Sequence, residues 1–243
     1  MRRRVLAGNW KMHGMRARLD EVEAIDAAAA GLELVLCLPA PLIPVAAAQV
    51  WHLAIGAQDC HAAAEGPHTG GISATMLADA GATWVILGHS ECRADGATDE
   101  EVAAKLAAAA PHLRAILCVG EYRRGEGAGA VERQLAASLP ADMAADALAV
   151  AYEPVWAIGT GLTPAPEEIA AMHVRLRAVL AARLGDRAAS VPILYGGSVS
   201  AGNAGAILAQ EEVDGLLVGG ASLRAETFLP IIAQFREREM RAS

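Results

Sequence analysis

The sequence is short of lysine and asparagine, although it is not short of basic residues. Of the 20 lysines and arginines among its 243 residues, only two are lysines, Lys11 and Lys105, and the chain has only two asparagines, Asn9 and Asn203. A lysine kept where arginine is used almost everywhere else indicates a position that needs a compact ammonium rather than a planar guanidinium. Asn9 and Lys11 stand two positions apart, which makes the pair a candidate for binding a small anion.

Other scarcities exclude whole classes of protein. Charged residues make up 20% of the chain and the formal net charge is −8, so no basic stripe is available for nucleic acid. The four cysteines show neither CxxC spacing nor the density of a disulfide framework, and Cys37 and Cys118 lie inside apolar runs, as buried free thiols do. No apolar stretch is long enough for a transmembrane helix, so no membrane partner is expected. Asn9, Lys11 and His13 interrupt the apolar stretch that a signal peptide would need, and we expect a cytoplasmic protein.

Apolar residues are plentiful, at 54% of the chain, and they gather in short continuous runs. The runs cover residues 5–7, 34–38, 53–55, 84–87, 115–119, 148–152, 193–195 and 216–218. Because they do not alternate with polar residues, they are typical of strands buried on both faces of a parallel sheet. Eight strand–helix units in roughly 250 residues favour an α/β fold with a single (β/α)8 barrel of parallel strands. An open doubly wound sheet stays possible at this point, because short apolar runs are ambiguous.

Segments of helical period separate these runs. In the stretch 166–184, one face collects Ile169, Met172, Leu176, Val179 and Leu180, and near the end of the chain a similar face collects Phe228, Ile231, Ile232 and Phe235. Thr98, followed three residues later by Glu101, predicts a capped helix start. No linker rich in glycine, serine or proline divides the chain, so residues 1–243 are expected to form one catalytic barrel domain.

The residues that stand out chemically follow the apolar runs directly. Asn9 and Lys11 follow the first run, His89 follows the fourth, and Glu153 ends the sixth. The carboxyl ends of barrel strands open onto one face, where active sites are built, so this clustering predicts an enzyme.

His89 and Glu153 are candidates for acid–base chemistry. A histidine just past a strand end lies close to the backbone amides of the next turn, which disfavour imidazolium and keep the ring neutral. Glu153 precedes the segment 154–161, whose proline, tryptophan and glycines resemble a lid that would exclude water from the carboxylate on closing. A structural histidine and a salt-bridged strand-end glutamate remain the alternatives.

Glycine pairs follow the last two runs, in Gly196-Gly197-Ser198 and Gly219-Gly220. Glycine lets backbone N–H groups crowd a phosphate, and the loops after strands 7 and 8 form a phosphate site in many barrels. An acidic protein can therefore hold a dianion with aimed amides and one lysine, without a basic surface.

Five segments together carry a resemblance to a known family. They are residues 8–12 (GNWKM), 87–91 (LGHSE), 151–161 (AYEPVWAIGTG), 195–199 (YGGSV) and 218–222 (VGGAS). In these segments, and over the whole chain, the sequence resembles the triosephosphate isomerases. The resemblance implies a TIM barrel that interconverts dihydroxyacetone phosphate and D-glyceraldehyde 3-phosphate in glycolysis and gluconeogenesis. It implies proton transfer through an enediolate, with no metal or organic cofactor.

The resemblance also implies a role for each matched residue. Glu153 would move the proton, and neutral His89 would donate to the carbonyl oxygen, assisted by Asn9 and Lys11. Tyr195 would help to hold the lid shut. The phosphate would be bound, together with Asn9 and Lys11, by the backbone amides of Gly159, Ser198, Gly219 and Gly220.

Three alternatives concern chemistry. A related isomerase acting on a four-carbon ketose phosphate, such as an erythrulose phosphate, would use the same residues. A barrel that binds a phosphorylated metabolite without turning it over would have no use for the base. The acidic residues and histidines of 59–68 match no zinc or iron pattern, so no metal site is expected.

The sequence departs from the family pattern at one place. Cys92 stands where the family has an arginine, and Gly71 and Thr98 stand where it has the two glutamates that pair with that arginine. A coordinated loss leaves no orphan buried charge. We expect a homodimer formed through the loop of residues 59–72 and held by packing and backbone hydrogen bonds.

Overall fold

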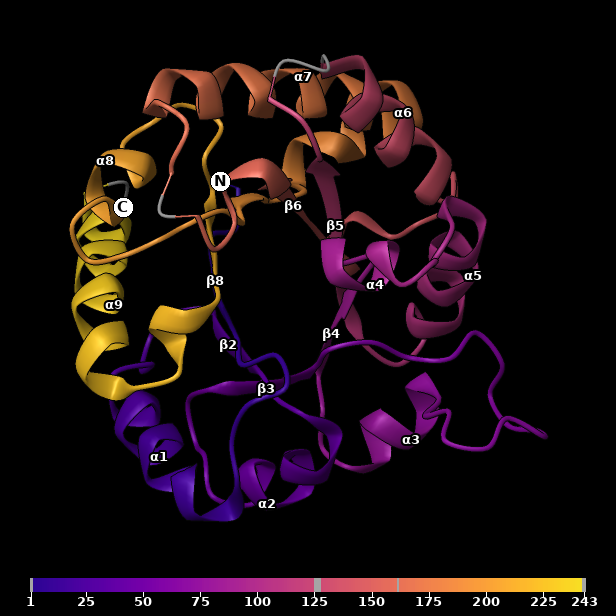
Figure 1. Cartoon of the computed structure of the whole chain (residues 1–243), viewed down its shortest axis with the longest axis vertical. Helices are drawn as coiled ribbons and strands as arrows, with labels where there is room; N and C mark the ends of the chain where they lie inside the picture. The colour runs from indigo at the N-terminus through magenta and orange to yellow at the C-terminus, as the bar shows by residue number, and fades with distance from the viewer. Residues whose placement is uncertain (1, 125–127, 161, 242–243) are drawn as a thin grey trace.

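Eight parallel strands close into a barrel, in chain order, in the computed structural model (Figure 1). The structure describes residues 2–124, 128–160 and 162–241. The strands are β1 (Val5–Asn9), β2 (Leu34–Cys37), β3 (Ala54–Ala57), β4 (Trp84–Leu87), β5 (Arg114–Glu121), β6 (Leu148–Pro154), β7 (Ile193–Tyr195) and β8 (Gly215–Val218). Parallel pairing of β1 with β8 closes the sheet, which confirms the (β/α)8 barrel and shows that the doubly wound alternative is wrong.

Helices form a ring around the barrel (Figure 1). They are α1 (Leu19–Ala27), α2 (Ile43–Ala47), α3 (Ala74–Asp79), α4 (Ser90–Ala94), α5 (Asp99–Ala109), α6 (Ala128–Ser138), α7 (Pro166–Leu184), α8 (Ala204–Leu208) and α9 (Ala225–Met240). The helix predicted at 166–184 has these bounds. The predicted capping box of α5 is also confirmed, because Thr98 Oγ1 accepts from the Glu101 amide and Glu101 returns the bond to the Thr98 amide.

The strands read as continuous apolar runs because both of their faces are buried. In β1, Val5 and Ala7 belong to a cluster with residues such as Ile116 and Leu194, which fills the barrel interior. The intervening Leu6 belongs to the larger cluster that packs the barrel wall against the helices. Burial on both sides of one sheet removes the polar alternation that a half-exposed strand would show.

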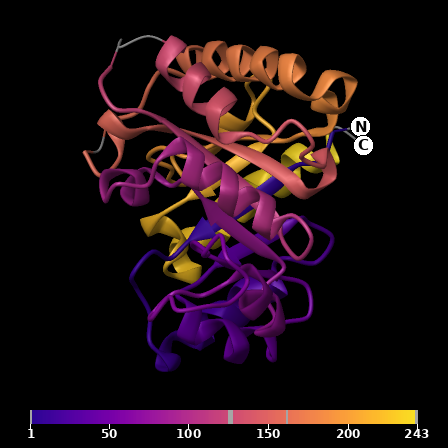
Figure 2. The same ribbon diagram turned by 90° about the vertical axis from the view of Figure 1, so that its right-hand side faces the viewer.

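All eight strands point the same way, so their carboxyl ends meet on one face. In Figure 2 the two chain ends lie together on the right, whereas the salmon-coloured segments that follow β6 reach the left. The loops that carry the candidate residues therefore lie on the face that Figure 1 presents to the viewer.

Candidate active site

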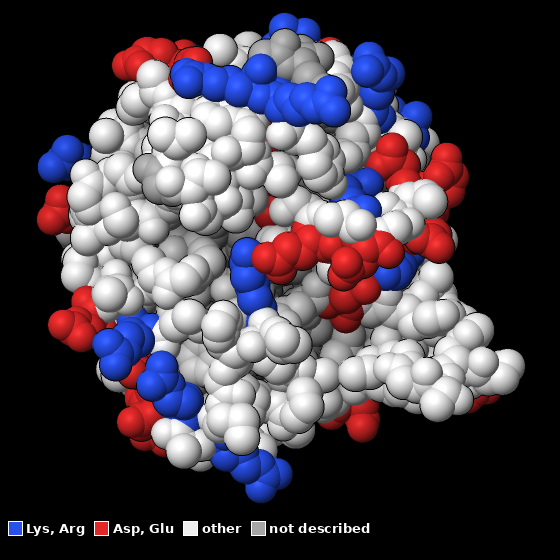
Figure 3. All heavy atoms as spheres, in the orientation of Figure 1, with Lys and Arg blue, Asp and Glu red and all other residues white. Residues whose placement is uncertain are grey.

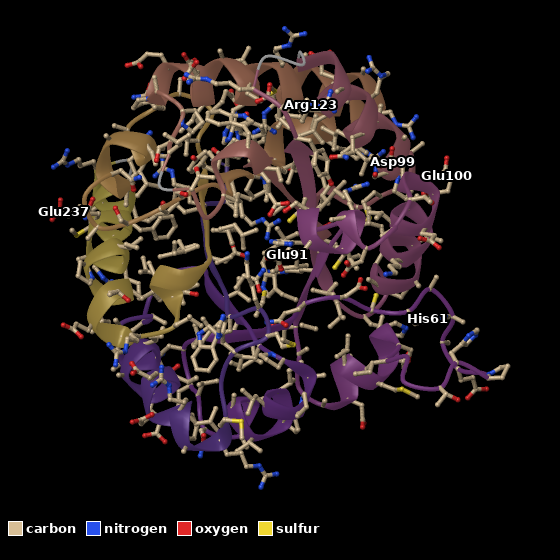
Figure 4. The ribbon with its side chains drawn as sticks, viewed as in Figure 1. His61, Glu91, Asp99, Glu100, Arg123 and Glu237 are labelled. Carbon is tan, nitrogen blue, oxygen red and sulfur yellow. The ribbon has the colours of Figure 1, made fainter. Side chains whose placement is uncertain are left out.

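Strand ends bring the four predicted catalytic residues to one small cavity. Asn9 is the last residue of β1, Glu153 lies next to last in β6, and His89 follows β4 by two positions. Together with Lys11 they line a cavity of about 40 Å³ at the mouth of the barrel. Figure 4 shows the neighbouring Glu91 near the centre of this face.

Glu153 is a buried carboxylate, only 1% exposed. Its Oε2 accepts the backbone N–H of Ser90 at 2.9 Å, and its Oε1 lies 3.0 Å from Nε2 of His89. That contact lacks hydrogen-bond alignment, so Oε1 is left without a partner among the described residues. No lysine or arginine of those residues pairs with Glu153, and the basic group that it faces is His89. An unpartnered carboxylate oxygen in a cavity is available to take a proton.

His89 is held with its other ring nitrogen as an acceptor. It is the N-cap of α4, and its Nδ1 accepts the backbone N–H of Glu91 at 3.2 Å. An acceptor Nδ1 leaves the proton of a neutral ring on Nε2, the nitrogen that faces Glu153. The expected contact between this ring and the amides of the following turn is therefore present.

Lys11 is held in a strained backbone conformation by its neighbours. It has φ of 53°, which a residue other than glycine rarely adopts and which costs about 1–3 kcal/mol. The Asn9 side chain accepts the Lys11 amide at 2.9 Å, and Gln58 Nε2 donates to the Lys11 carbonyl at 2.9 Å. Strain held from both sides is typical of a functional position. Gln58 was not predicted, because nothing near it in the sequence indicates this long-range contact.

The ammonium of Lys11 is partnered by Glu91, with Nζ 2.6 Å from Oε1. Partial burial works against ionisation of Glu91, but the hydrogen bond and charge of Lys11 prevail and lower the pKa of that carboxyl. The face is hollowed at this place, where basic and acidic side chains meet (Figure 3). The ion pair with Glu91 thus positions the Lys11 ammonium where it lines both cavities.

A larger cavity of about 440 Å³ adjoins the first one. Its walls come from the segments after β6, β7 and β8, and include the four residues whose backbone amides are predicted to bind the phosphate: Gly159, Ser198, Gly219 and Gly220. Asn9, which is also predicted to bind the phosphate, lines the smaller cavity instead. Lys11 reaches both cavities. The backbone N–H groups of Gly159 and Ser198 donate to no acceptor among the described residues, so they are free to bind a ligand.

The glycines of this region serve different purposes. Gly220 has an ordinary φ, and a Cβ built on it would meet nothing within 4 Å, so neither strain nor packing requires glycine there. Close approach of a ligand to the backbone remains as the reason. A Cβ on Gly197 would instead lie 2.2 Å from the hydroxyl oxygen of Tyr195, and one on Gly196 would lie 3.2 Å from Cγ of Glu153. Glycine at positions 196 and 197 therefore makes room for neighbouring side chains. The sequence alone does not indicate this role.

The segment after Glu153 is tied back against β5. Trp156, in a 3₁₀ turn over Val155–Ala157, donates from Nε1 to Glu121 at 2.8 Å, and the Tyr152 hydroxyl donates to the same oxygen. The guanidinium of Arg124 lies 4.9 Å above the indole. The buried hydroxyl of Tyr195 has no partner among the described residues. The expected lid covers 154–161, of which Gly161 lies outside the described residues.

Another cavity, of about 600 Å³ and therefore larger than either of these two, lies at the opposite end of the barrel. Its arginine, Arg114, already pairs with Glu33 at 2.7 Å and stacks on Trp84. Size alone therefore does not mark the site, because the unpartnered oxygen of Glu153 lies at the other mouth.

The rest of the described chain contains no competing centre. All four cysteines are free, and burial raises the pKa of the Cys37 and Cys118 thiols. Among residues 2–124, 128–160 and 162–241, no three histidine, cysteine, aspartate or glutamate side chains are grouped to hold a metal ion. No helix of that part of the chain is long and apolar enough to cross a membrane.

A closed parallel barrel with a buried carboxylate that has one unpartnered oxygen, an imidazole beside it and free amides at its carboxyl end belongs to the barrel enzymes equipped for acid–base chemistry on small anions. The triosephosphate isomerase family model matches residues 4–235. Triosephosphate isomerase of Jannaschia sp. (strain CCS1) is 53% identical, over 96% of this chain and 98% of its own length. That of Ruegeria sp. (strain TM1040) is 51% identical, over 96% and 98%. A crystal structure of triosephosphate isomerase from Bartonella henselae superposes with a TM-score of 0.90 at 39% identity, covering 96% of this chain and 99% of that one. The chain belongs to the triosephosphate isomerase family.

Proposed function

We propose that this chain interconverts dihydroxyacetone phosphate and D-glyceraldehyde 3-phosphate through an enediolate, as an intramolecular aldose–ketose isomerase of glycolysis and gluconeogenesis. The observation that carries the proposal is the pair formed by Glu153 Oε1, buried without a hydrogen bond, and His89 Nε2, 3.0 Å away. A base and an acid that face the same small cavity can move a proton between adjacent carbons.

The proton transfer uses the chain's own side chains. Glu153 removes a proton from the carbon next to the ketose carbonyl, while His89 donates from Nε2 to the carbonyl oxygen. Lys11 offsets the negative charge that develops on the enediolate, and Asn9 holds Lys11 in place. Glu153 then returns the proton to the neighbouring carbon, while the hydroxyl group of the first carbon gives its proton back to His89 and becomes the aldehyde carbonyl. Substrate and product therefore differ only in the positions of hydrogens, and no cofactor is required.

The phosphate occupies the larger cavity. Backbone amides of Gly159, Ser198, Gly219 and Gly220 bind its oxygens, and Lys11 supplies positive charge. The free amides and the bare backbone at Gly220 support this assignment. The segment 154–161 closes over this ligand as a lid, and the Tyr195 hydroxyl, which has no partner among the described residues, helps to hold it shut. A closed lid excludes water and retains the reactive enediolate.

Among the alternatives, the family supports the three-carbon substrate over a four-carbon ketose phosphate. A non-catalytic barrel would not bury a carboxylate without a partner, because desolvating that group is costly and serves no purpose in binding an anion. A coupled assay of the purified protein tests the choice. Turnover of dihydroxyacetone phosphate should exceed that of erythrulose phosphates, and the reverse order would overturn the proposal.

We also propose that the protein works as a cytoplasmic homodimer. The loop of residues 59–72 protrudes from the body, at the lower right of Figure 3, and is largely uncharged. Large apolar side chains are exposed beside the site and this loop, namely Met12, Met15, Ile72 and Met76. An exposed apolar group of this kind is typical of an interface. Four free cysteines suit a reducing compartment.

A further inference from the structure

Asn203 is the second of the two asparagines, and the proposed reaction does not use it. It lies directly before α8, and it lines the cavity of about 440 Å³ assigned to the phosphate. Asn9, the other asparagine, holds the backbone of a binding residue through its side chain. The side chain of Asn203 likewise forms hydrogen bonds with backbone groups.

The Asn203 side chain joins two points of the loop after β7. Its Nδ2 donates to the Ser198 carbonyl at 3.0 Å, and its Oδ1 accepts the Ser200 amide at 2.8 Å. The backbone amide of Asn203 also donates to the Ser200 carbonyl at 3.2 Å. The two side-chain bonds need a donor and an acceptor on one short side chain, a pair that asparagine offers and an ionised aspartate does not.

These bonds restrain Ser198 from one side, and the lid restrains it from the other. Ser198 Oγ donates to the Ala157 carbonyl at 3.0 Å, while Asn203 holds the Ser198 carbonyl. The Ser198 amide itself has no acceptor among the described residues. A donor that is already oriented binds an anion more tightly, because no loop ordering has to accompany binding.

We propose that Asn203 is a positioning residue that holds residues 198–200 in the shape in which the Ser198 amide faces the substrate phosphate. The inference rests on the proposed assignment of the phosphate to this cavity. It predicts that the side chain of Asn203 controls affinity for the anion more than the rate of proton transfer.

The test compares Asn203→Ala and Asn203→Asp with a matched control, Gln210→Ala. Gln210 carries an amide just beyond the other end of α8, and among the described residues its side chain bonds only the exposed Ala206 carbonyl. Inorganic phosphate serves as the competitive probe, measured beside KM, kcat and thermal unfolding. Asn203→Ala should raise both KM and the phosphate inhibition constant about three- to tenfold, the loss expected for hydrogen bonds between neutral groups, with a smaller change in kcat.

Asn203→Asp should have a larger effect, because its carboxylate would face the Ser198 carbonyl and repel the dianion. It keeps the shape of the wild-type side chain, so it remains measurable if Asn203→Ala does not fold. Gln210→Ala should change neither constant. If the Asn203 variants lower the unfolding temperature but leave KM and phosphate inhibition unchanged, the residue is merely structural and the inference is wrong.

Gly220→Ala separates failure of this inference from failure of the site. The added methyl group meets no protein atom within 4 Å, so it should leave stability unchanged and weaken phosphate binding by obstructing the anion. Unchanged phosphate inhibition in Gly220→Ala would place the anion elsewhere and overturn the site assignment itself. Weaker inhibition in Gly220→Ala, together with unchanged inhibition in Asn203→Ala, would overturn only the role of Asn203.

Discussion

Single residues in this site are defined by the partners that their polar atoms have and lack. Glu153 keeps one oxygen bonded to the Ser90 amide and leaves the other one free, so the carboxylate is oriented without being neutralised. The nearby ammonium of Lys11 forms an ion pair with Glu91 rather than with Glu153. A salt bridge between Lys11 and Glu153 would satisfy both charges and leave the small cavity without a free base.

Glu153→Gln should therefore preserve the fold and remove most of the turnover. The amide oxygen can still accept the Ser90 N–H, but the neutral side chain cannot take the proton, and general-base catalysis is worth about 10²–10⁴-fold. The coupled isomerase assay measures the loss. Glu167→Gln, on the exposed first turn of α7, is the matched control and should keep full activity. A Glu153→Gln enzyme with more than about half the wild-type rate would contradict the role of base.

Lys11→Met should weaken substrate binding and slow the reaction, because it removes the only positive charge that reaches both cavities. Lys11→Arg should recover little of the loss, since a planar fork differs in shape and reach from an ammonium. Steady-state kinetics give both constants. The control is Lys105→Arg, because Lys105 pairs with Asp59 outside the cavities and an arginine can make the same pair. Full activity in Lys11→Arg would reduce Lys11 to an ordinary surface charge.

At the scale of elements, the sequence predicts what depends on local pattern. Each of the eight strands overlaps a predicted apolar run, and α7 has its predicted bounds. Both features could be predicted because an apolar run and a helical period are patterns of residues close together in the sequence. His89 and Glu153 were found because they directly follow or end a run. Gln58 and the steric role of Gly197 depend on Lys11 and Tyr195 approaching them in space, and no local pattern carries that information.

Helix α7 buries one histidine that should make stability depend on pH. His173 is fully buried, its Nδ1 donates to the Glu212 carbonyl at 2.9 Å, and burial lowers its pKa from 6.5 to about 4. Below pH 6.5 the unfolded chain binds a proton at this residue and the folded chain does not, so stability falls as the pH drops from 6.5 towards 4. The loss amounts to about 3 kcal/mol over that window.

Urea unfolding at intervals between pH 7 and pH 4.5 measures this dependence. The matched variant is His173→Gln, which keeps a donor but does not titrate. It should be less stable overall, because its shape differs, yet its stability should change much less with pH above 4.5. A wild-type slope that persists unchanged in His173→Gln would mean that other groups cause the acid sensitivity.

The whole molecule combines a net charge of −8 with an anionic substrate. In the proposed site, free amides and one lysine would bind the phosphate, so a protein of negative net charge needs no basic surface to hold an anion. The features that support the proposed dimer are likewise confined to one part of the surface. The loop of residues 59–72, on which Figure 4 labels His61, closes on itself through a backbone bond from His61 to Ile72 at 2.8 Å. It protrudes with little charge, so packing rather than ion pairing is available to hold a partner.

Other interactions are found where the family has an arginine paired with two glutamates and this chain has Cys92, Gly71 and Thr98. Lys105 pairs with Asp59 at 2.7 Å, which links the start of this loop to α5. Thr98 caps α5, so Thr98→Glu would lose a cap worth about 0.5–2 kcal/mol. A Cβ on Gly71 would lie only 3.1 Å from the His68 carbonyl. Restoring the two family glutamates is therefore a poor way to accommodate an arginine at position 92.

Cys92→Arg should destabilise the protein and its dimer. Burial raises the pKa of the Cys92 thiol, and both Asp59 and Lys105 are close enough to contribute to that pKa. A new guanidinium would compete with Lys105 for one carboxylate, which leaves one cation without a full partner at a cost of about 1–3 kcal/mol.

Adding Lys105→Met frees Asp59 for the guanidinium, so the double variant should recover much of the loss and show strong coupling in a mutant cycle. Cys92→Ser, which adds no charge, is the control. Thermal denaturation and sedimentation of the wild type, the two single variants and the double variant of the cycle, and Cys92→Ser decide the matter. If Cys92→Arg alone is neutral, the position is open to water in the assembled protein and cannot lie in a packed interface.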